Sequence, residues 1–176
     1  MDDILSWIIG IFIVSILMFI FPLMVMADRA DDLSQLTIQI ATTEFVDEIR
    51  TIGKITNDAY NNYIYNLSTT GNTYNIEMTV KVLDENPAHI VIEKNDDASE
   101  STGQNLFYSI YTSQIEKTLE EAGELNLKEG DVMSVSVKNT NLTLKQQLNN
   151  FFYIVTGNET YTIAASHSGI VATTGI

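Results

Sequence analysis

The stretch that decides the fold is Ile4 to Ala27, which reads ILSWIIGIFIVSILMFIFPLMVMA. These 24 residues carry no charge. At a helical rise of about 1.5 Å per residue they cover roughly 36 Å, more than the ~30 Å hydrocarbon thickness of a bilayer. Two aspartates precede the stretch, and Asp28 and Arg29 follow it, so the apolar run ends at charge on both sides. This pattern predicts a membrane-spanning helix at residues 1–30.

A cleaved secretory signal is the alternative interpretation of this stretch. Such signals begin with basic residues and have an apolar core of about 7 to 15 residues, whereas the first five residues here contain two aspartates and no Lys or Arg. Retention as an anchor is therefore the better interpretation. Arg29 is the only basic residue close to the span, and the positive-inside tendency, taken literally, would place the following residues in the cytoplasm. One arginine among three aspartates decides little.

Residues 31–53 are predicted to continue the helix as an amphipathic segment that ends at Gly53. Their apolar residues recur at spacings that approximate one stripe along the helix. These residues are Leu33, Leu36, Ile40, Phe45, Val46, Ile49 and Ile52. An unbroken helix from Asp3 to Thr51 would be roughly 70 Å long, and only its first half fits into lipid. The second half must therefore contact either the chain's own following residues or the helices of neighbouring copies.

Residues 54–176 are predicted to form a small globular head, so that the fold class is α+β. Helices are predicted at Asn57 to Thr69, Asn105 to Ala122 and after Thr143. Strands are predicted at Thr73 to Leu83, His89 to Glu93, Val132 to Val137, and from Tyr161 to Ala165 or on to Val171. This order favours a mainly antiparallel sheet.

The composition argues against several kinds of partner. The formal net charge of −14 lies almost wholly outside the apolar run, and so acidic a surface repels phosphate backbones. Nucleic acid is therefore not an expected partner. The chain has no cysteines, which leaves no disulfides, thiolate metal ligands or Cys nucleophile. Glycine-rich phosphate motifs are absent as well, and no small-molecule substrate is expected.

The sequence contains no recognisable catalytic or metal-binding motif. His89 and His167 stand outside any spaced set of metal ligands, and Ser166 beside His167 lacks the pattern of a nucleophile elbow. The carboxylates between Asp96 and Glu100 are of the type that a hard cation such as calcium prefers, but their spacing is not that of an EF-hand. A solvated acidic loop is the better interpretation. We expect no enzymatic activity, no cofactor and no metal.

Three local phrases carry a resemblance to a known family. They are FVDEIRTIGKIT at 45–56, TGNTYNIE at 70–77, and GD at 130–131 leading to VSVKN at 135–139. Together with the layout of an apolar helix, an amphipathic continuation and a small head, they resemble type IV pilins and pseudopilins. In detail they are similar to small pilin-like proteins of Gram-positive bacteria related to Tad-type minor pilins. The resemblance implies a filament subunit with its head outside the cell membrane, which assembles with copies of itself or with other pilin-like subunits.

The sequence departs from the family's pattern at its start. A type IV pilin signal has a short basic leader that ends in Gly directly before the apolar helix, whereas Gly10 is the only glycine of this span. Either the chain is used unprocessed, or the filament mechanism does not apply. In the latter case the alternative is a single-pass accessory protein of a secretion or conjugation apparatus, whose head binds a partner. The residues expected to contact lipid or other subunits are Ile4, Trp7, Ile8, Ile11, Phe12, Ile16, Phe19, Ile20, Leu23, Leu33, Leu36 and Ile40.

Overall fold

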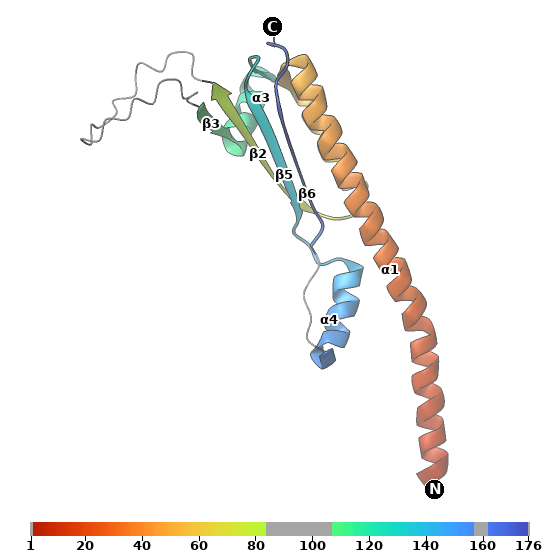
Figure 1. The fold of residues 1–176 in the computed structure, drawn as a ribbon. Helices are drawn as coiled ribbons and strands as arrows, with labels where there is room; N and C mark the ends of the chain where they lie inside the picture. Colours follow the sequence, from red (N-terminus) through yellow and green to blue (C-terminus); the bar gives the residue numbers. More distant parts are fainter. Residues whose placement is uncertain (1, 84–106, 157–161, 176) are drawn as a thin grey trace, which may run out of the picture.

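The structure is a computed structural model of the chain, and it describes residues 2–83, 107–156 and 162–175. Its largest element is α1, Asp2–Ile52, an unbroken helix of 51 residues (Figure 1). The N-terminal half of α1 extends away from the head, and the C-terminal half lies along it. The long helix predicted from the sequence is confirmed.

The C-terminal half of α1 is fixed to the head by buried side chains. Val46 and Ile49 are fully buried, and Phe45 is buried beside them. Phe45 stacks on Tyr63 of α2, Asn57–Ser68, with ring centroids 4.4 Å apart. Burying a side chain of this size contributes about 1.5–3 kcal/mol. These contacts therefore hold the second half of α1 to the head.

The boundary between α1 and α2 follows the local sequence signals. Gly53 has a φ of +77°, a conformation that glycine adopts readily, and its N–H donates to the carbonyl of Ile49 at 2.8 Å. Thr56 is the N-cap of α2, since its hydroxyl accepts from the N–H of Ala59 at 3.2 Å. Both boundary residues predicted from the sequence are confirmed.

Four antiparallel strands form the main sheet, in the order β3-β2-β5-β6. They are β2, Tyr74–Leu83; β3, Phe107–Tyr111; β5, Val132–Asn139; and β6, Ala164–Ile170. One face of the sheet is buried, with Met78, Val80 and Val135 in the core, while Glu77 and Lys81 lie on the exposed face. α1 lies against β5 and β6. The head is thus α+β with an antiparallel sheet, as predicted, and the strands predicted at β2 and β5 are confirmed.

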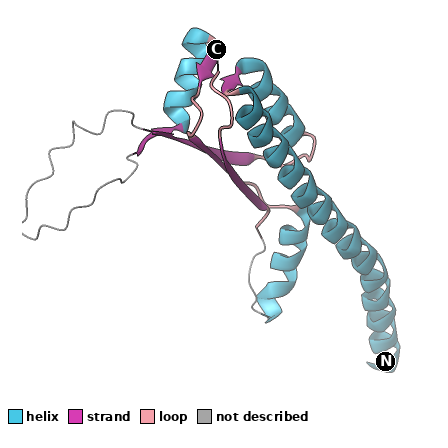
Figure 2. Ribbon diagram, turned by 45° about the horizontal axis from the view of Figure 1, so that its top comes forward, coloured by secondary structure: helices cyan, strands magenta, loops and turns pink. Residues whose placement is uncertain are grey.

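A second, two-stranded sheet closes the far end of α1, and the sequence patterns do not reveal it. β1, Lys54–Thr56, pairs antiparallel with β4, Glu124–Asn126. The N–H of Leu127 donates to the carbonyl of Gly53 at 2.8 Å, and the N–H of Gly175 donates to the carbonyl of Leu127 at 2.9 Å. The C-terminal residues therefore cross the end of α1 (Figure 2).

The helix predicted at Asn105 to Ala122 is wrong in its first part. Phe107 to Tyr111 form β3, which pairs with β2, and helix α3 covers only Thr112–Ala122. Thr112 fixes the change, because its hydroxyl accepts from the N–H of Met78 at 2.7 Å and lies 3.2 Å from the carbonyl oxygen of that residue. Aromatic residues suit a strand well, and here pairing with β2 overrides a spacing that also fits a helix.

The last helix, α4, Leu144–Thr156, is confirmed with its predicted cap. The hydroxyl of Thr143 accepts from the N–H of Gln146 at 3.3 Å, and the side chain of Gln146 accepts from the N–H of Thr143 at 3.0 Å. β6 begins at Ala164 and ends at Ile170. The strand predicted at His89 to Glu93, the acidic loop at Lys94 to Gln104 and Tyr161 lie outside the described residues.

Candidate assembly surface on helix α1

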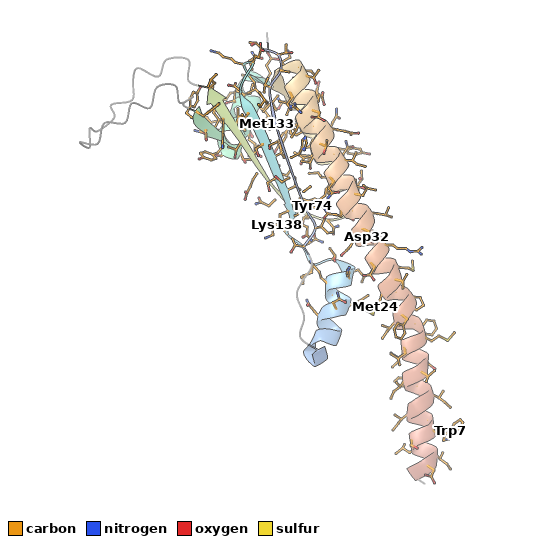
Figure 3. The ribbon with its side chains drawn as sticks, in the orientation of Figure 1. Trp7, Met24, Asp32, Tyr74, Met133 and Lys138 are labelled. Atoms are coloured by element: carbon orange, nitrogen blue, oxygen red, sulfur yellow. The ribbon has the colours of Figure 1, made fainter. Side chains whose placement is uncertain are left out.

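The N-terminal half of α1 presents apolar side chains on all sides. Trp7 is 74% exposed, and Figure 3 shows it near the free end of the helix, away from the head. Among the described residues, α1 is the one helix long and apolar enough to cross a membrane, and none of its most apolar window is buried. Of the predicted contact residues, Ile20 is half-buried, whereas Ile4, Trp7, Ile8, Ile11, Phe12, Ile16, Phe19 and Leu23 are exposed.

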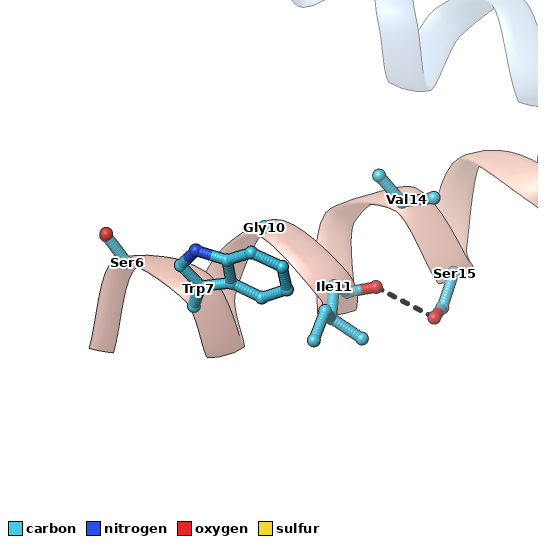
Figure 4. A pocket seen from close by; sticks show the side chains of 6 residues that line it. All are labelled: Ser6, Trp7, Gly10, Ile11, Val14 and Ser15. Carbon is cyan, nitrogen blue, oxygen red and sulfur yellow. Dashed lines mark hydrogen bonds between the residues drawn. The ribbon is translucent and has the colours of Figure 1, made fainter. Parts of the chain in front are cut away.

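A shallow open groove lies over Gly10, where the helix has no side chain, and residues on the neighbouring turns of α1 line it (Figure 4). Its lining residues are Ser6, Trp7, Gly10, Ile11, Val14 and Ser15. The hydroxyl of Ser15 donates to the carbonyl of Ile11 at 2.8 Å, and that of Ser6 donates to the carbonyl of Asp3 at 3.1 Å. Because these hydroxyls are satisfied within the helix, the groove offers an apolar contact rather than a polar binding site.

The C-terminal half of α1 carries two apolar faces, and the single stripe predicted from the sequence is therefore wrong. Phe45, Val46 and Ile49 are buried against the head. Leu33, Leu36 and Ile40 are 64%, 52% and 49% exposed, and Ile52 is exposed too. At about 100° per residue, Leu33, Leu36 and Ile40 lie within roughly 60° of one another, on the side opposite the buried face. The predicted contact residues on this part of α1 thus remain free of the head.

The face that binds the head contains residues that hydropathy alone does not single out. Besides Ile38 it includes Ala41 and Thr42, both buried. The hydroxyl of Thr42 donates to the carbonyl of Ile38 at 2.6 Å and lies 3.0 Å from the hydroxyl of Tyr63. The signal in the sequence is the spacing of Ile38, Thr42, Phe45 and Ile49, at three and four residues.

The histidines and carboxylates of the described parts of the chain do not gather into a candidate metal site. In residues 2–83, 107–156 and 162–175, no group of three or more His, Asp or Glu side chains is placed to hold a metal ion. Nε2 of His167 lies 3.7 Å from Oδ1 of Asp47, which in turn accepts from Nη1 of Arg50 at 2.9 Å. His89 and the carboxylates between Asp96 and Glu100 lie outside the described residues.

Two tyrosines beneath α1 have raised pKa values. Burial raises the pKa of Tyr63 to about 12, against an opposing hydrogen bond with Thr42. Burial also raises the pKa of Tyr60, and so does its hydrogen bond to Oε1 of Glu116 at 2.6 Å. The folded head therefore favours the neutral phenols, and one unit of pKa shift corresponds to about 1.4 kcal/mol.

Stability should be fully present below the unfolded tyrosine pKa of about 10 and should fall as the pH rises from about 10 to 12. Thermal unfolding of the chain in detergent, followed by circular dichroism across this range, measures the effect. The double variant Tyr60→Phe/Tyr63→Phe should show a flatter decline, because it lacks the two ionising groups. Equal slopes for the variant and the wild type would contradict the assignment.

The described residues thus form a small α+β head carried on one long, largely uncovered apolar helix. Comparisons with protein-family models, with curated proteins and with solved structures found no match to this chain. The resemblance to pilin-like proteins therefore stays a prediction from the sequence.

Proposed function

We propose that this protein is a structural subunit of a bacterial surface filament. α1 anchors the subunit in the cell membrane, with the head outside, and then binds the equivalent helices of other copies or of related subunits during assembly. An apolar helix that leaves lipid must find another apolar environment, so extraction and bundling involve the same residues. The acidic head would then cover the outside of the filament.

The observation that carries this proposal is the exposed stripe of Leu33, Leu36 and Ile40. A membrane anchor requires apolar surface only as far as lipid extends, and the apolar run ends at Ala27. The stripe lies beyond that point, on the side of α1 that the head leaves open. Exposed apolar residues that gather on one face, next to a longer apolar surface, are typical of a protein interface.

Leu36→Asp tests the proposal without disturbing the head. The side chain is half exposed and takes no part in the core, so folding should be unchanged. Burying a leucine contributes about 1.5–3 kcal/mol, and a carboxylate in its place adds a desolvation cost, so assembly should fall at least about tenfold. The measurement is the amount of chain in sheared surface appendages, with electron microscopy of the cells.

Asn62→Asp is the matched control, because it adds the same charge at an exposed position of α2. This variant should assemble like the wild type. If Leu36→Asp also assembled normally, the stripe would have no role in subunit contacts. If the wild-type chain occurred only in membranes, without filaments, the accessory protein of a secretion or conjugation apparatus would be the better interpretation.

A further inference from the structure

The first turn of α4 is tied to α1 just beyond the apolar run. The hydroxyl of Thr143 donates to Oδ2 of Asp31 at 2.8 Å, and Asp31 is only 3% exposed. Nζ of Lys145 lies 3.0 Å from Oδ1 of Asp28. The hydrogen bond to Asp28 raises the pKa of Lys145, and the charges of Asp28, Asp31 and Asp32 add to the shift, although partial burial opposes it. α4 therefore begins at the level where α1 would leave the lipid.

From this point α4 runs back along α1, toward the N-terminus of the long helix (Figures 1 and 2). Thr156 lies eleven positions after Lys145, a rise of roughly 16 Å along the helix, the same distance that separates Asp28 from Leu17 on α1. On the intervening part of α1, Ala27 is 1% exposed and Met24 and Ile20 are half-buried. The last turns of α4 are thus level with residues that the sequence assigns to lipid.

The sequence of α4 changes in the same direction. After Lys145, residues 146–150 read QQLNN, polar except for Leu148, whereas residues 151–155 read FFYIV. No charged residue occurs between Lys145 and Glu159. At the start of α4, Leu142 and Leu144 are exposed. The helix is therefore polar at the level of the charged cluster on α1 and apolar farther along the membrane span.

We propose that α4 is a second membrane-contacting element, whose last turns enter the leaflet on the side of the head. This inference rests on the proposed function, which places Ile4 to Ala27 in a membrane before assembly. If that segment spans lipid, the tip of α4 reaches acyl-chain depth, where apolar aromatic residues are favourable and polar ones are not.

A fluorescence measurement on the full chain in phosphatidylcholine vesicles tests this inference, because the protein has a single tryptophan, Trp7. The variant Trp7→Phe/Tyr153→Trp moves that tryptophan to α4. Its emission should shift to shorter wavelength and lose intensity in vesicles of brominated lipid. Trp7→Phe/Tyr65→Trp, which carries its tryptophan at an exposed position of α2, should lose none.

The native chain separates the possible failures. Quenching of Trp7 without quenching of the tryptophan at position 153 would overturn the insertion of α4 and leave the membrane span intact. Absence of quenching for Trp7 would overturn the membrane step of the proposed function itself. Circular dichroism shows whether each variant folds. If the variant at 153 did not fold, Trp7→Phe/Leu144→Trp would replace it, since Leu144 is exposed in the first turn of α4. Bromine near the headgroup should quench this tryptophan, although more weakly than expected for position 153. If no quenching occurred, the result would count against the inference.

Discussion

Ile13→Asp is expected to lower the membrane-inserted fraction of the chain about a hundredfold and to abolish assembly. Ile13 lies near the middle of the span, where a carboxylate costs about 2.5–3.5 kcal/mol in helix insertion. Each 1.4 kcal/mol corresponds to a factor of ten. The side chain is half exposed and is not part of the core cluster of the described residues, so the folding of the head should be unaffected. The measurement is the share of the chain that resists carbonate extraction from membranes.

Ile13→Val is the matched control, because it keeps an apolar β-branched side chain at the same position and should insert and assemble normally. Wild-type levels of carbonate-resistant Ile13→Asp would contradict a membrane span at Ile4 to Ala27. Insertion that is normal but followed by failed assembly would place the cost in helix bundling rather than in lipid. Insertion and assembly are measured separately because residues in the N-terminal half of α1 belong both to the membrane span and to the assembly surface.

The elements that depend on local signals could be predicted from the sequence. The first half of α1 follows from its length and its lack of charge, and the second half from the spacing of its apolar residues up to Gly53. α2 follows from the cap at Thr56, and α4 from the cap at Thr143. The failures involve pairing between distant residues. β1 and β4 have three residues each, too few to show a period of two. β3 is a strand because it pairs with β2, and its first residue, Phe107, lies 24 positions after Leu83, the last residue of β2.

The two faces of α1 could not be separated from the sequence for a different reason. Periodicity identifies apolar positions but does not say which of them the chain's own head covers. The covered face includes Thr42, whose hydroxyl is satisfied by Ile38 and Tyr63, and this makes a polar residue acceptable in the core. The more hydrophobic Leu36 stays exposed. The candidate surface is defined by the position of the head, which only the three-dimensional structure gives.

The phrases that resemble pilin-like proteins contain residues with structural roles in this fold. Asp131 is buried, and its carboxylate accepts from the N–H of Leu83 at 3.0 Å and from that of Lys128 at 2.8 Å. Asn139, at the end of β5, donates from its side chain to the carbonyl of Asn141 at 2.9 Å. Gly53 closes α1. The resemblance thus bears on how the head folds, and the proposed assembly depends instead on the exposed faces of α1.

Gly53→Ala is expected to destabilise the head by about 2–6 kcal/mol. The φ of +77° at Gly53 costs a residue with a side chain about 1–3 kcal/mol. A Cβ at this position would also collide with the backbone of Thr173, Thr174 and Gly175. Since a backbone segment cannot rotate away as a side chain does, displacing it adds about 1–3 kcal/mol. Thermal unfolding of the full chain in detergent, followed by circular dichroism, should show a midpoint lower by about 10 °C.

Gly71→Ala separates the two contributions, because it shares the backbone conformation without the collision. Gly71 has a φ of +74°, and a Cβ there meets nothing within 4 Å. It should therefore cost only the conformational part, about 1–3 kcal/mol, or a few degrees in the unfolding midpoint. Equal losses in the two variants would show that the C-terminal residues yield at little cost. A much larger loss at Gly53 would show that residues 173–175 hold the end of α1 against β4, and so keep the helix aligned on the head.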